Sequence, residues 1–262
     1  GGLLSHTVEV ASIGRAAAIA FAQEGAYVVV CDVHDERGNN TVQYIRGLGQ
    51  DAEFQHIDVA DSGAVENLVY EIVMRHGQLD FAFNNAGIEG EWKHTAEYDE
   101  AMFDQVIGVN VKGVFLGLRH VLPEMLRQKS GAIVNTASVA GLVATPGMPA
   151  YVASKHAVIG LTKTAAGEVA REGVRVNAVC PGPVDTRMIH SLEQQINPGD
   201  PESVARRYQS AMPTGRYTTP DEIANMVLFL CSDLASNITG GQFVVDGGRT
   251  ATGGAVTNVI DR

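Results

Sequence analysis

The segment that decides the fold is residues 13–32, IGRAAAIAFAQEGAYVVVCD, in which an alanine-rich stretch, a glycine and an apolar run follow one another. The alanine-rich part, 13–24, has the composition of a helix, and Gly25 can take the left-handed conformation that closes one. Residues 27–32 are apolar and rich in β-branched side chains, which is typical of a strand buried on both faces. A helix that leads directly into such a strand indicates one unit of a parallel α/β sheet.

The same alternation continues to the end of the chain and predicts a single domain over residues 1–262. We expect a Rossmann-type α/β fold, a doubly wound parallel sheet of about seven strands with helices on both faces. Pro123 is expected to kink the longest helix. Further strands are predicted at 53–57, 79–84, 132–137, 174–180 and 242–245. Further helices are predicted at 36–48, 62–76, 99–128, 150–171 and 220–232.

Charge and composition narrow the class of partner. A formal charge of −11 opposes encounter with nucleic acid or an anionic membrane, so we expect neither as a partner. No run reaches the roughly 18 apolar residues of a membrane span, and the N-terminal residues do not resemble a signal peptide. The three cysteines, Cys31, Cys180 and Cys231, form no CxxC pair and lie in or beside apolar runs, where cysteine serves as a small buried side chain. These features favour a cytoplasmic protein.

Three side chains form a candidate catalytic group. Tyr151 and Lys155 are four residues apart on a predicted helix and therefore share a face. A nearby cation favours phenolate, which would let the tyrosine exchange a proton with a substrate alcohol closer to neutral pH. A Tyr–Lys pair alone is more often a surface coincidence. Ser138 follows the strand 132–137, and the loop after it can return the chain to the tyrosine.

Several motifs in this order resemble one known family. Asn84-Asn85-Ala86-Gly87 ends a strand, Asn110 lies in a helix, and Pro181-Gly182-Pro183-Val184-Asp185-Thr186 follows another strand. With Ser138, Tyr151 and Lys155, these make the chain similar to the short-chain dehydrogenase/reductases over roughly residues 12–248.

The resemblance implies a role for each of these residues. Tyr151 would be the general acid/base, Lys155 would lower its pKa and bind the nicotinamide ribose, Ser138 would orient the carbonyl, and Asn110 would position a water in a proton relay. The implied cofactor-binding residues are Ser12, Ile13, Gly14, Asp32, Asp58, Val59, Asn84, Ala86, Gly87, Tyr151, Lys155, Pro181, Gly182, Val184 and Thr186. Structural alternatives remain for some of them: Asn84 could satisfy backbone groups at a strand end, Asp58 could cap the helix near Ser62, and Pro181-Gly182 could be only a turn.

Asp32 favours NAD over NADP as the cofactor. A carboxylate at the end of this strand can accept hydrogen bonds from the adenosine ribose and would repel a 2′-phosphate. Arg37 is close enough in sequence to leave NADP open, and Asp32 could instead cap the following helix.

The N-terminal end departs from the family, which normally has a Thr-Gly-x-x-x-Gly-x-Gly turn around the cofactor pyrophosphate. Aligned without a gap, that motif falls on Thr7, Val8, Ser12 and Gly14, so only the last glycine remains. Alternatively, residues 7–11 form the first strand with most of the turn deleted, or the N-terminal sequence is altered. The helix that follows Ser12 still offers free backbone amides to a phosphate.

Residues 183–219 are less regular and predict a substrate loop or lid, with a turn at 197–201. The histidines have no metal-ligand spacing, so we expect no metal. His190 is a candidate substrate contact, whereas His156 is expected to face solvent. The expected pocket borders are mostly apolar and favour a cyclic or hydrophobic alcohol: Val139, Gly141, Val143, Met148, Met188 and Ile189.

The resulting prediction is an oxidoreductase that transfers a hydride between NAD(H) and a secondary alcohol or ketone. One alternative is an NADPH-dependent 3-oxoacyl carrier-protein reductase, against which Asp32 and the acidic charge argue. Another is a non-catalytic binding protein that has lost its glycine-rich loop. The resemblance also implies a homotetramer formed through helices 99–128 and 150–171.

Overall fold

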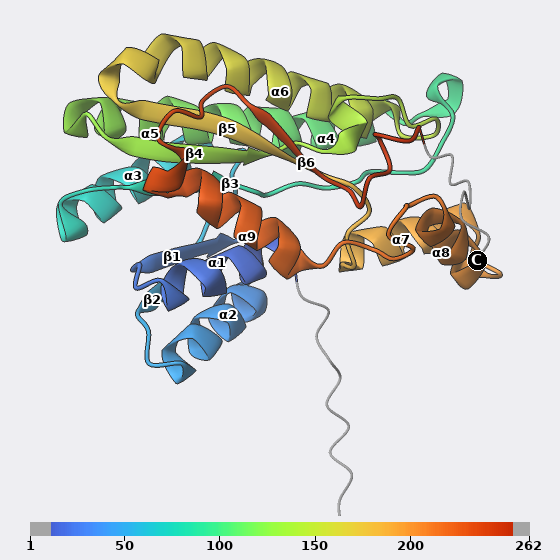
Figure 1. Ribbon diagram of the computed structural model, residues 1–262, viewed down its shortest axis with the longest axis horizontal. Helices are drawn as coiled ribbons and strands as arrows, with labels where there is room; N and C mark the ends of the chain where they lie inside the picture. Colours follow the sequence, from blue (N-terminus) through green and yellow to red (C-terminus); the bar gives the residue numbers. More distant parts are fainter. Residues whose placement is uncertain (1–11, 254–262) are drawn as a thin grey trace, which may run out of the picture.

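A computed structural model describes residues 12–253, so the candidate strand at 7–11 and the position of Val8 lie outside it (Figure 1). The described chain alternates helices and strands as expected. The strands are β1 Val28–Asp32, β2 Ala52–His56, β3 Phe81–Asn84, β4 Gly131–Thr136, β5 Val174–Pro181 and β6 Gln242–Val245. The α-helices are α1 Ile13–Gln23, α2 Asp35–Gly47, α3 Ser62–His76, α4 Glu100–Ile107, α5 Gly113–Gln128, α6 Pro149–Val169, α7 Arg187–Ile196, α8 Pro201–Ser210 and α9 Pro220–Cys231.

All strand pairs in the described part of the chain are parallel. β1 pairs with β2 in one ladder, and β3, β4, β5 and β6 pair in that order in a second ladder. The predicted glycine caps are present, since Gly25, Gly49 and Gly77 have φ angles of 86°, 79° and 79°. Parallel strands joined through helices confirm the predicted α/β class, with six strands among residues 12–253.

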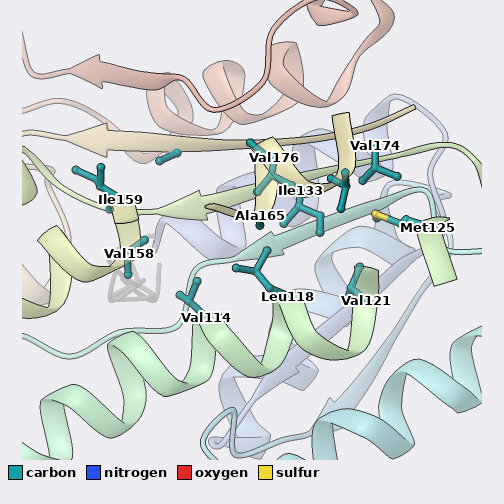
Figure 2. Close-up of a cluster of buried hydrophobic side chains, with 14 of the residues drawn as sticks. Val114, Leu118, Val121, Met125, Ile133, Val158, Ile159, Ala165, Val174 and Val176 are labelled. Carbon is teal, nitrogen blue, oxygen red and sulfur yellow. The ribbon is translucent and has the colours of Figure 1, made fainter. Parts of the chain in front are cut away.

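Helices cover both faces of the four-stranded ladder (Figure 1). On one face, α5 and α6 pack on β4 and β5, and Figure 2 shows their side chains meeting between the layers. On the other face, α9 packs on β4, β5 and β6 and also contacts α1. The core between the sheet and the helices α5 and α6 consists of fully or nearly fully buried residues, among them Val114, Leu118, Met125, Ile133, Val158, Val174 and Val176.

The prediction of a single continuous helix over residues 99–128 is wrong in the middle of this segment. Asp99 caps α4, five residues of π-helix follow at Gly108–Lys112, and α5 then continues with Pro123 inside it. The segment Glu100–Gln128 is long and apolar enough to cross a membrane by length and composition alone. Core helices pass the same test, and α5 packs its apolar side on the sheet.

The segment 183–219 is more regular than predicted, because it contains the two helices α7 and α8. The turn predicted at 197–201 separates them, and Asp200 caps α8 by accepting a hydrogen bond from the Ser203 amide at 3.1 Å. The apolar side chains of the segment 183–219 pack together near the end of β5, where Met148 and Tyr151 contact Ile189, Leu192 and Met212. The segment therefore lies over the tyrosine of the predicted catalytic group.

Candidate active site

The carboxyl ends of β4 and β5 and the first turns of α6 bring the predicted catalytic side chains together. Ser138 follows β4, and its hydroxyl accepts a hydrogen bond from the Ala140 amide at 3.1 Å and donates to the Pro181 carbonyl at 3.4 Å. Lys155 is only 3% exposed, and its Nζ donates to the Thr136 carbonyl at 2.8 Å. This Nζ lies 5.5 Å from the centre of the Tyr151 ring.

Burial dominates the protonation of this group. It raises the pKa of Tyr151 to about 12, against a smaller lowering by a hydrogen bond from Ser138. Burial also lowers the pKa of Lys155 to about 8. The sequence interpretation assigned the lowering of the tyrosine pKa to the lysine, whereas here Ser138 has this effect and the ammonium is held on Thr136. Tyr151 is therefore held in its proton-donating form.

Asn110 lies behind these residues, in the π-helical turn between α4 and α5. Its amide exchanges two hydrogen bonds with the Ile88 backbone, at 2.8 and 2.9 Å, and donates a third to the Ser154 hydroxyl at 3.0 Å. A Cβ added at Gly87 would lie 3.2 Å from the Asn110 oxygen and 3.5 Å from Lys155 Nζ. The motif glycine thus lets the backbone pass close to both side chains, and π-helical turns often occur at functional sites.

One continuous cavity, bordered by described residues, connects this group with the ends of β1 and β2. Asn110 does not line it, whereas every other predicted catalytic or cofactor-binding residue does. Of the expected pocket borders, Val139, Met148, Met188 and Ile189 line it, but Gly141 and Val143 do not. A Cβ at Gly141 would lie 2.6 Å from the Lys155 carbonyl, so this glycine packs against α6, and Val143 is half exposed elsewhere.

The N-terminus of α1 opens onto the same cavity. Ser12 caps the helix, accepting a hydrogen bond from the Arg15 amide at 3.2 Å, and Ile13 and Gly14 line the cavity beside it. A Cβ at Gly14 would lie 2.9 Å from the side-chain amide of Asn85. The remaining glycine of the motif therefore permits close approach between α1 and the loop after β3.

Asp32 ends β1 at the edge of the cavity, and its side chain is 36% exposed. Its Oδ1 accepts a hydrogen bond from the His34 amide at 2.9 Å and lies 3.2 Å from His34 Nδ1. His34 is the N-cap residue of α2 and makes no side-chain cap bond. Asp32 thus orders the turn before α2 while remaining at the cavity, where Arg37 is also present.

Asn84 and Asp58 each had a possible structural role, as a partner of strand-end backbone groups and as a helix cap. Asn84 donates to the Asn135 side chain at 2.8 Å, which in turn donates to Thr162 at 2.9 Å, so it links two strands and α6. It does this through side chains and not through strand-end backbone groups. Asp58 accepts from the Ala60 amide at 2.9 Å, and the cap of α3 is Asp61, so capping by Asp58 is wrong. Val59 packs closely against Gly113 beside it.

The loop after β5 is fixed by backbone contacts on both sides. The Gly182 amide donates to Val245 at 3.0 Å, and a Cβ at Gly182 would lie 2.7 Å from that of Asp246. Val184 and Thr218 form a β-bridge. The segment Pro181-Gly182 therefore is more than a free turn, because it aligns Val184 and Thr186 along the cavity wall.

Sequence reasoning missed several side chains that support the site. Asn85 accepts a hydrogen bond from the Thr136 hydroxyl at 3.0 Å, and Ser154 holds Asn110. Asn85 belongs to the quoted motif and could have been found there, whereas Ser154 carries no sequence signal beyond its position next to Lys155.

The remaining histidine and cysteine expectations have mixed outcomes. His190 does not line the cavity, while His156 is exposed and lies 2.9 Å from the Val152 carbonyl. Cys180 and Cys231 are buried, but Cys31 is exposed because it borders the cavity. Within residues 12–253, no group of three or more His, Cys, Asp or Glu side chains is placed to hold a metal ion.

The chain matches a family model along most of its length. This model, described as enoyl-(acyl carrier protein) reductase, covers residues 8–250. The chain belongs to the short-chain dehydrogenase/reductase family. It is 40% identical to a levodione reductase of Leifsonia aquatica over 241 residues, covering 91% of this chain and 90% of the relative. A cyclohexanol dehydrogenase of Acinetobacter sp. strain SE19 is 41% identical over 239 residues, with 91% of each chain covered. A 3-oxoacyl-[acyl-carrier-protein] reductase of Thermotoga maritima is 39% identical over 236 residues, covering 90% of this chain and 92% of the relative.

Solved structures agree with this assignment. A levodione reductase crystal structure superposes with a TM-score of 0.90 at 38% identity, covering 92% of this chain and 94% of the other. An NAD⁺-bound xylitol dehydrogenase gives 0.86 at 35% identity, covering 90% and 94%. A gluconate 5-dehydrogenase from Burkholderia cenocepacia, in complex with NADP and tartrate, gives 0.85 at 29% identity, covering 94% and 92%. The family is thus an oxidoreductase family, and its members here include both an NAD-bound and an NADP-bound protein.

Proposed function

We propose that this protein is an NAD(H)-dependent dehydrogenase or reductase that interconverts a secondary alcohol, preferably cyclic or hydrophobic, and its ketone. The observation that carries the proposal is the convergence of Ser138, Tyr151 and Lys155 at one end of the cavity. A phenol within hydrogen-bond reach of a second hydroxyl, beside a buried ammonium, is suited to proton exchange with a carbinol oxygen.

The residues around the cavity fit a nicotinamide dinucleotide. The cavity runs from Asp32 to Tyr151, so a long ligand can reach both ends. Gly87 leaves a backbone surface beside Lys155, and α1 directs free backbone amides toward the space where a diphosphate would lie. When bound, the cofactor would accept or supply the hydride at the substrate carbon.

The chain's own residues would handle the proton. In ketone reduction, the phenol of Tyr151 would donate its proton to the substrate oxygen while Ser138 hydrogen-bonds to the same oxygen. In alcohol oxidation, the same proton would return to the phenolate. The raised pKa of Tyr151 keeps it protonated at neutral pH, which suits reduction in the conformation described. A cofactor ribose could replace Thr136 as the partner of the Lys155 ammonium and bring that charge to bear on the phenol.

Apolar side chains beside Tyr151 support the substrate class. Met148, Ile189 and Leu192 line the cavity and pack in one cluster with the tyrosine. The relatives include a cyclohexanol dehydrogenase, whose name indicates a cyclic alcohol. A cyclohexanol or cyclic ketone could bury its ring against this cluster with its oxygen at the phenol.

The first experiment is titration of the purified protein with NADH and NADPH, followed by nicotinamide fluorescence. Tighter binding of NADH, then turnover of cyclic alcohols that fails in Tyr151→Phe, is the expected result. Binding of neither cofactor would contradict the proposal and leave the non-catalytic alternative, in which the altered N-terminal loop has abolished binding.

A second candidate is an NADPH-dependent 3-oxoacyl carrier-protein reductase. It is favoured by the Thermotoga maritima relative and by Arg37, which borders the cavity near Asp32. The net charge of −11 argues against an acidic carrier-protein partner. Turnover of a 3-oxoacyl thioester with NADPH, exceeding that of cyclic ketones with NADH, would favour this candidate.

We further propose that the protein acts in the cytoplasm as a homotetramer through α4, α5 and α6, without nucleic acid or membrane partners. Phe103 and Phe115 lie exposed on these helices, and their burial between subunits would favour association. Light scattering is expected to give four times the 27.8 kDa chain mass. A monomer at micromolar concentration would contradict the assembly but not the activity.

A further inference from the structure

His190, on the helix that covers the tyrosine, lies between two carboxyl groups. Its Nε2 is 2.9 Å from Asp185 Oδ1, and its Nδ1 is 3.0 Å from Glu193 Oε2. A neutral imidazole has only one N–H, and an ionised carboxylate can only accept. Both contacts can therefore be hydrogen bonds to carboxylates only when the imidazole carries two protons.

Glu193 gives this arrangement its buried end. The residue is 5% exposed, and its other oxygen accepts a hydrogen bond from the Tyr217 hydroxyl at 2.6 Å. A buried carboxyl group is costly unless its oxygens have partners. His190 and Tyr217 supply one partner to each oxygen.

Asp185 gives the arrangement its connection to the active site. It lies between Val184 and Thr186, which line the cavity where the nicotinamide is expected. Its amide donates to the Thr218 carbonyl at 2.9 Å, next to the Val184–Thr218 bridge. His190 thus joins α7 to the side chain of the loop after β5, while its neighbour on the same helix, Glu193, joins α7 to Tyr217 in the segment before α9.

We propose that His190 is a positioning residue whose imidazolium bridges Asp185 and Glu193, holds α7 on the loop 183–186, and thereby strengthens cofactor binding. The proposal rests on the proposed function for its cofactor, NADH. The bridge itself is a property of residues 185–217 and can be measured without activity.

The charges around His190 support the protonated form. The hydrogen bond with Glu193 has the largest effect and raises the pKa of His190. Desolvation comes next and lowers the pKa, and the charge of Glu193 together with the hydrogen bond and charge of Asp185 raises it further. On α7 itself, Arg187 is the remaining charged neighbour toward the helix start. Burial and Glu193 hold the pKa of Tyr217 far above its usual value, so this phenol stays a donor.

The last element packed here is α8, which contributes Tyr208. The guanidinium groups of Arg207 and Arg249 lie 5.9 and 5.7 Å from the centre of its ring. These two cations face the ring and not the imidazole, and Tyr208 also has a raised pKa because of burial. The two carboxyl groups are therefore the dominant charges at His190.

The sign of the pH effect follows from the raised pKa. The bridge is complete below the ordinary pKa of histidine and is lost as the pH rises through the raised value. On losing a proton, the imidazole keeps its bond to buried Glu193, which water cannot reach. It releases Asp185, whose side chain is 58% exposed and can be hydrated. High pH therefore frees the Asp185 side chain from His190, which leaves the loop held by its backbone contacts alone.

The test measures NADH binding by fluorescence between pH 6 and pH 9 in the full chain and in His190→Gln. Glutamine is uncharged at every pH, so its contacts with the two carboxyl groups do not titrate. We expect the wild-type Kd to rise roughly tenfold more than the Kd of the variant over this range. A rise of this size corresponds to the loss of one charge-assisted hydrogen bond. His120→Gln is the matched control, because His120 contacts Ser62 at 3.1 Å, and it should follow the wild type.

A second measurement follows the imidazole signal of His190 by NMR, in the wild type and in Asp185→Asn. We expect a midpoint above the ordinary value of about 6.5, lowered by the substitution, which removes one carboxylate. An unshifted midpoint, or equal pH dependence of Kd in wild type and His190→Gln, would overturn the proposal. If neither the wild type nor any variant binds NADH, the proposed function fails. A raised imidazole midpoint that depends on Asp185 would in that case support the bridge alone and overturn its link to cofactor binding.

Discussion

The cavity has a catalytic end, at Ser138 and Lys155, and an adenosine end, at Ser12, Asp32 and Asp58. The side chains at these two ends are held in place in different ways. At the catalytic end, the contacts join residues distant in sequence: Lys155 to Thr136, 19 positions apart, and Ser138 to Pro181, 43 apart. At the adenosine end, the polar side chains bind their own neighbours: Ser12 to Arg15, Asp32 to His34, and Asp58 to Ala60.

Burial follows the same division. Asn110, Lys155 and Ser138 are 0%, 3% and 8% exposed, whereas Asp32 is partly exposed and Asp58 is exposed. Tertiary packing fixes the catalytic group before any ligand binds, because moving one residue would break contacts in several elements. The polar side chains at the adenosine end make mainly local contacts, so they can adapt to a changed loop with little effect on the predicted catalytic residues. This difference is consistent with a chain that departs from its family at the N-terminal turn while Ser138, Tyr151 and Lys155 stay together.

The largest expected effect tests the catalytic end. Tyr151→Phe removes the proton donor but keeps the ring in its apolar cluster, so kcat should fall about 10²- to 10⁴-fold. Turnover with a saturating cyclic ketone and NADH measures it. The Kd for NADH should change far less than kcat, since the other implied cofactor-binding residues are untouched. A variant that keeps more than a tenth of wild-type kcat would mean that the proton comes from another group.

The next effect concerns the protonation of Lys155. The folded pKa of about 8 lies below the ordinary value of about 10.4, so the unfolded chain binds more protons between these pH values. The contribution of Lys155 to the free energy of unfolding should therefore rise with pH over this window, by about 2 kcal/mol between pH 8 and pH 10. Tyr151, whose pKa is raised to about 12, affects the pH dependence of unfolding mainly above pH 10.

Urea unfolding of the wild type and Lys155→Met checks this expectation. The wild type should gain stability relative to Lys155→Met as the pH rises, because methionine has no charge to bury. Titrating groups away from the lysine, such as Cys31 and Cys231, are common to both proteins and cancel. Cys180 does not cancel fully, because the lysine charge lowers its pKa. A difference that is constant from pH 7 to pH 10 would show that the lysine is not desolvated as described.

A smaller effect compares packing at the two ends. Val134 on β4 is fully buried, whereas Val29 on β1 is only partly buried beside the cavity. Val134→Ala should lower the free energy of unfolding by about 2 kcal/mol, and Val29→Ala by less than about 1 kcal/mol. Equal losses in urea titrations would mean that the two ends are packed equally well.

The sequence predicted the fold closely where periodicity and caps agreed. The helix 62–76 was predicted with the observed bounds, because Asp61 and Gly77 cap its two ends. The π-helical turn at 108–112 was missed, since its residues have ordinary helical character and the turn depends on packing around Asn110. The helices α7 and α8 were missed because their apolar side chains face a small separate cluster, which left no strong pattern in a segment rich in turn residues.

For the site, the motifs predicted which residues share the cavity but not how they are held. Tyr151, Lys155 and Ser138 were found from helical spacing and strand position, which the sequence contains. The contacts of Lys155 with Thr136, and of Asn84 with Asn135, depend on strand register, which one sequence does not reveal. The roles assigned to these residues stay predictions until they are measured.

The last and smallest expected effect concerns Asp32, at the locally ordered end. Asparagine can take the same hydrogen bond from the His34 amide, so Asp32→Asn keeps the turn before α2 but removes the charge. The preference for NADH over NADPH should fall roughly fivefold, because a partly exposed carboxylate repels a 2′-phosphate by about 1 kcal/mol. The ratio of the two Kd values, from fluorescence titrations, measures this preference. Asp61→Asn is the matched control, as it changes a helix cap outside the cavity and should leave the ratio unchanged. If Asp32→Asn also leaves the ratio unchanged, Asp32 orders the turn only, and Arg37 would be the next residue to substitute.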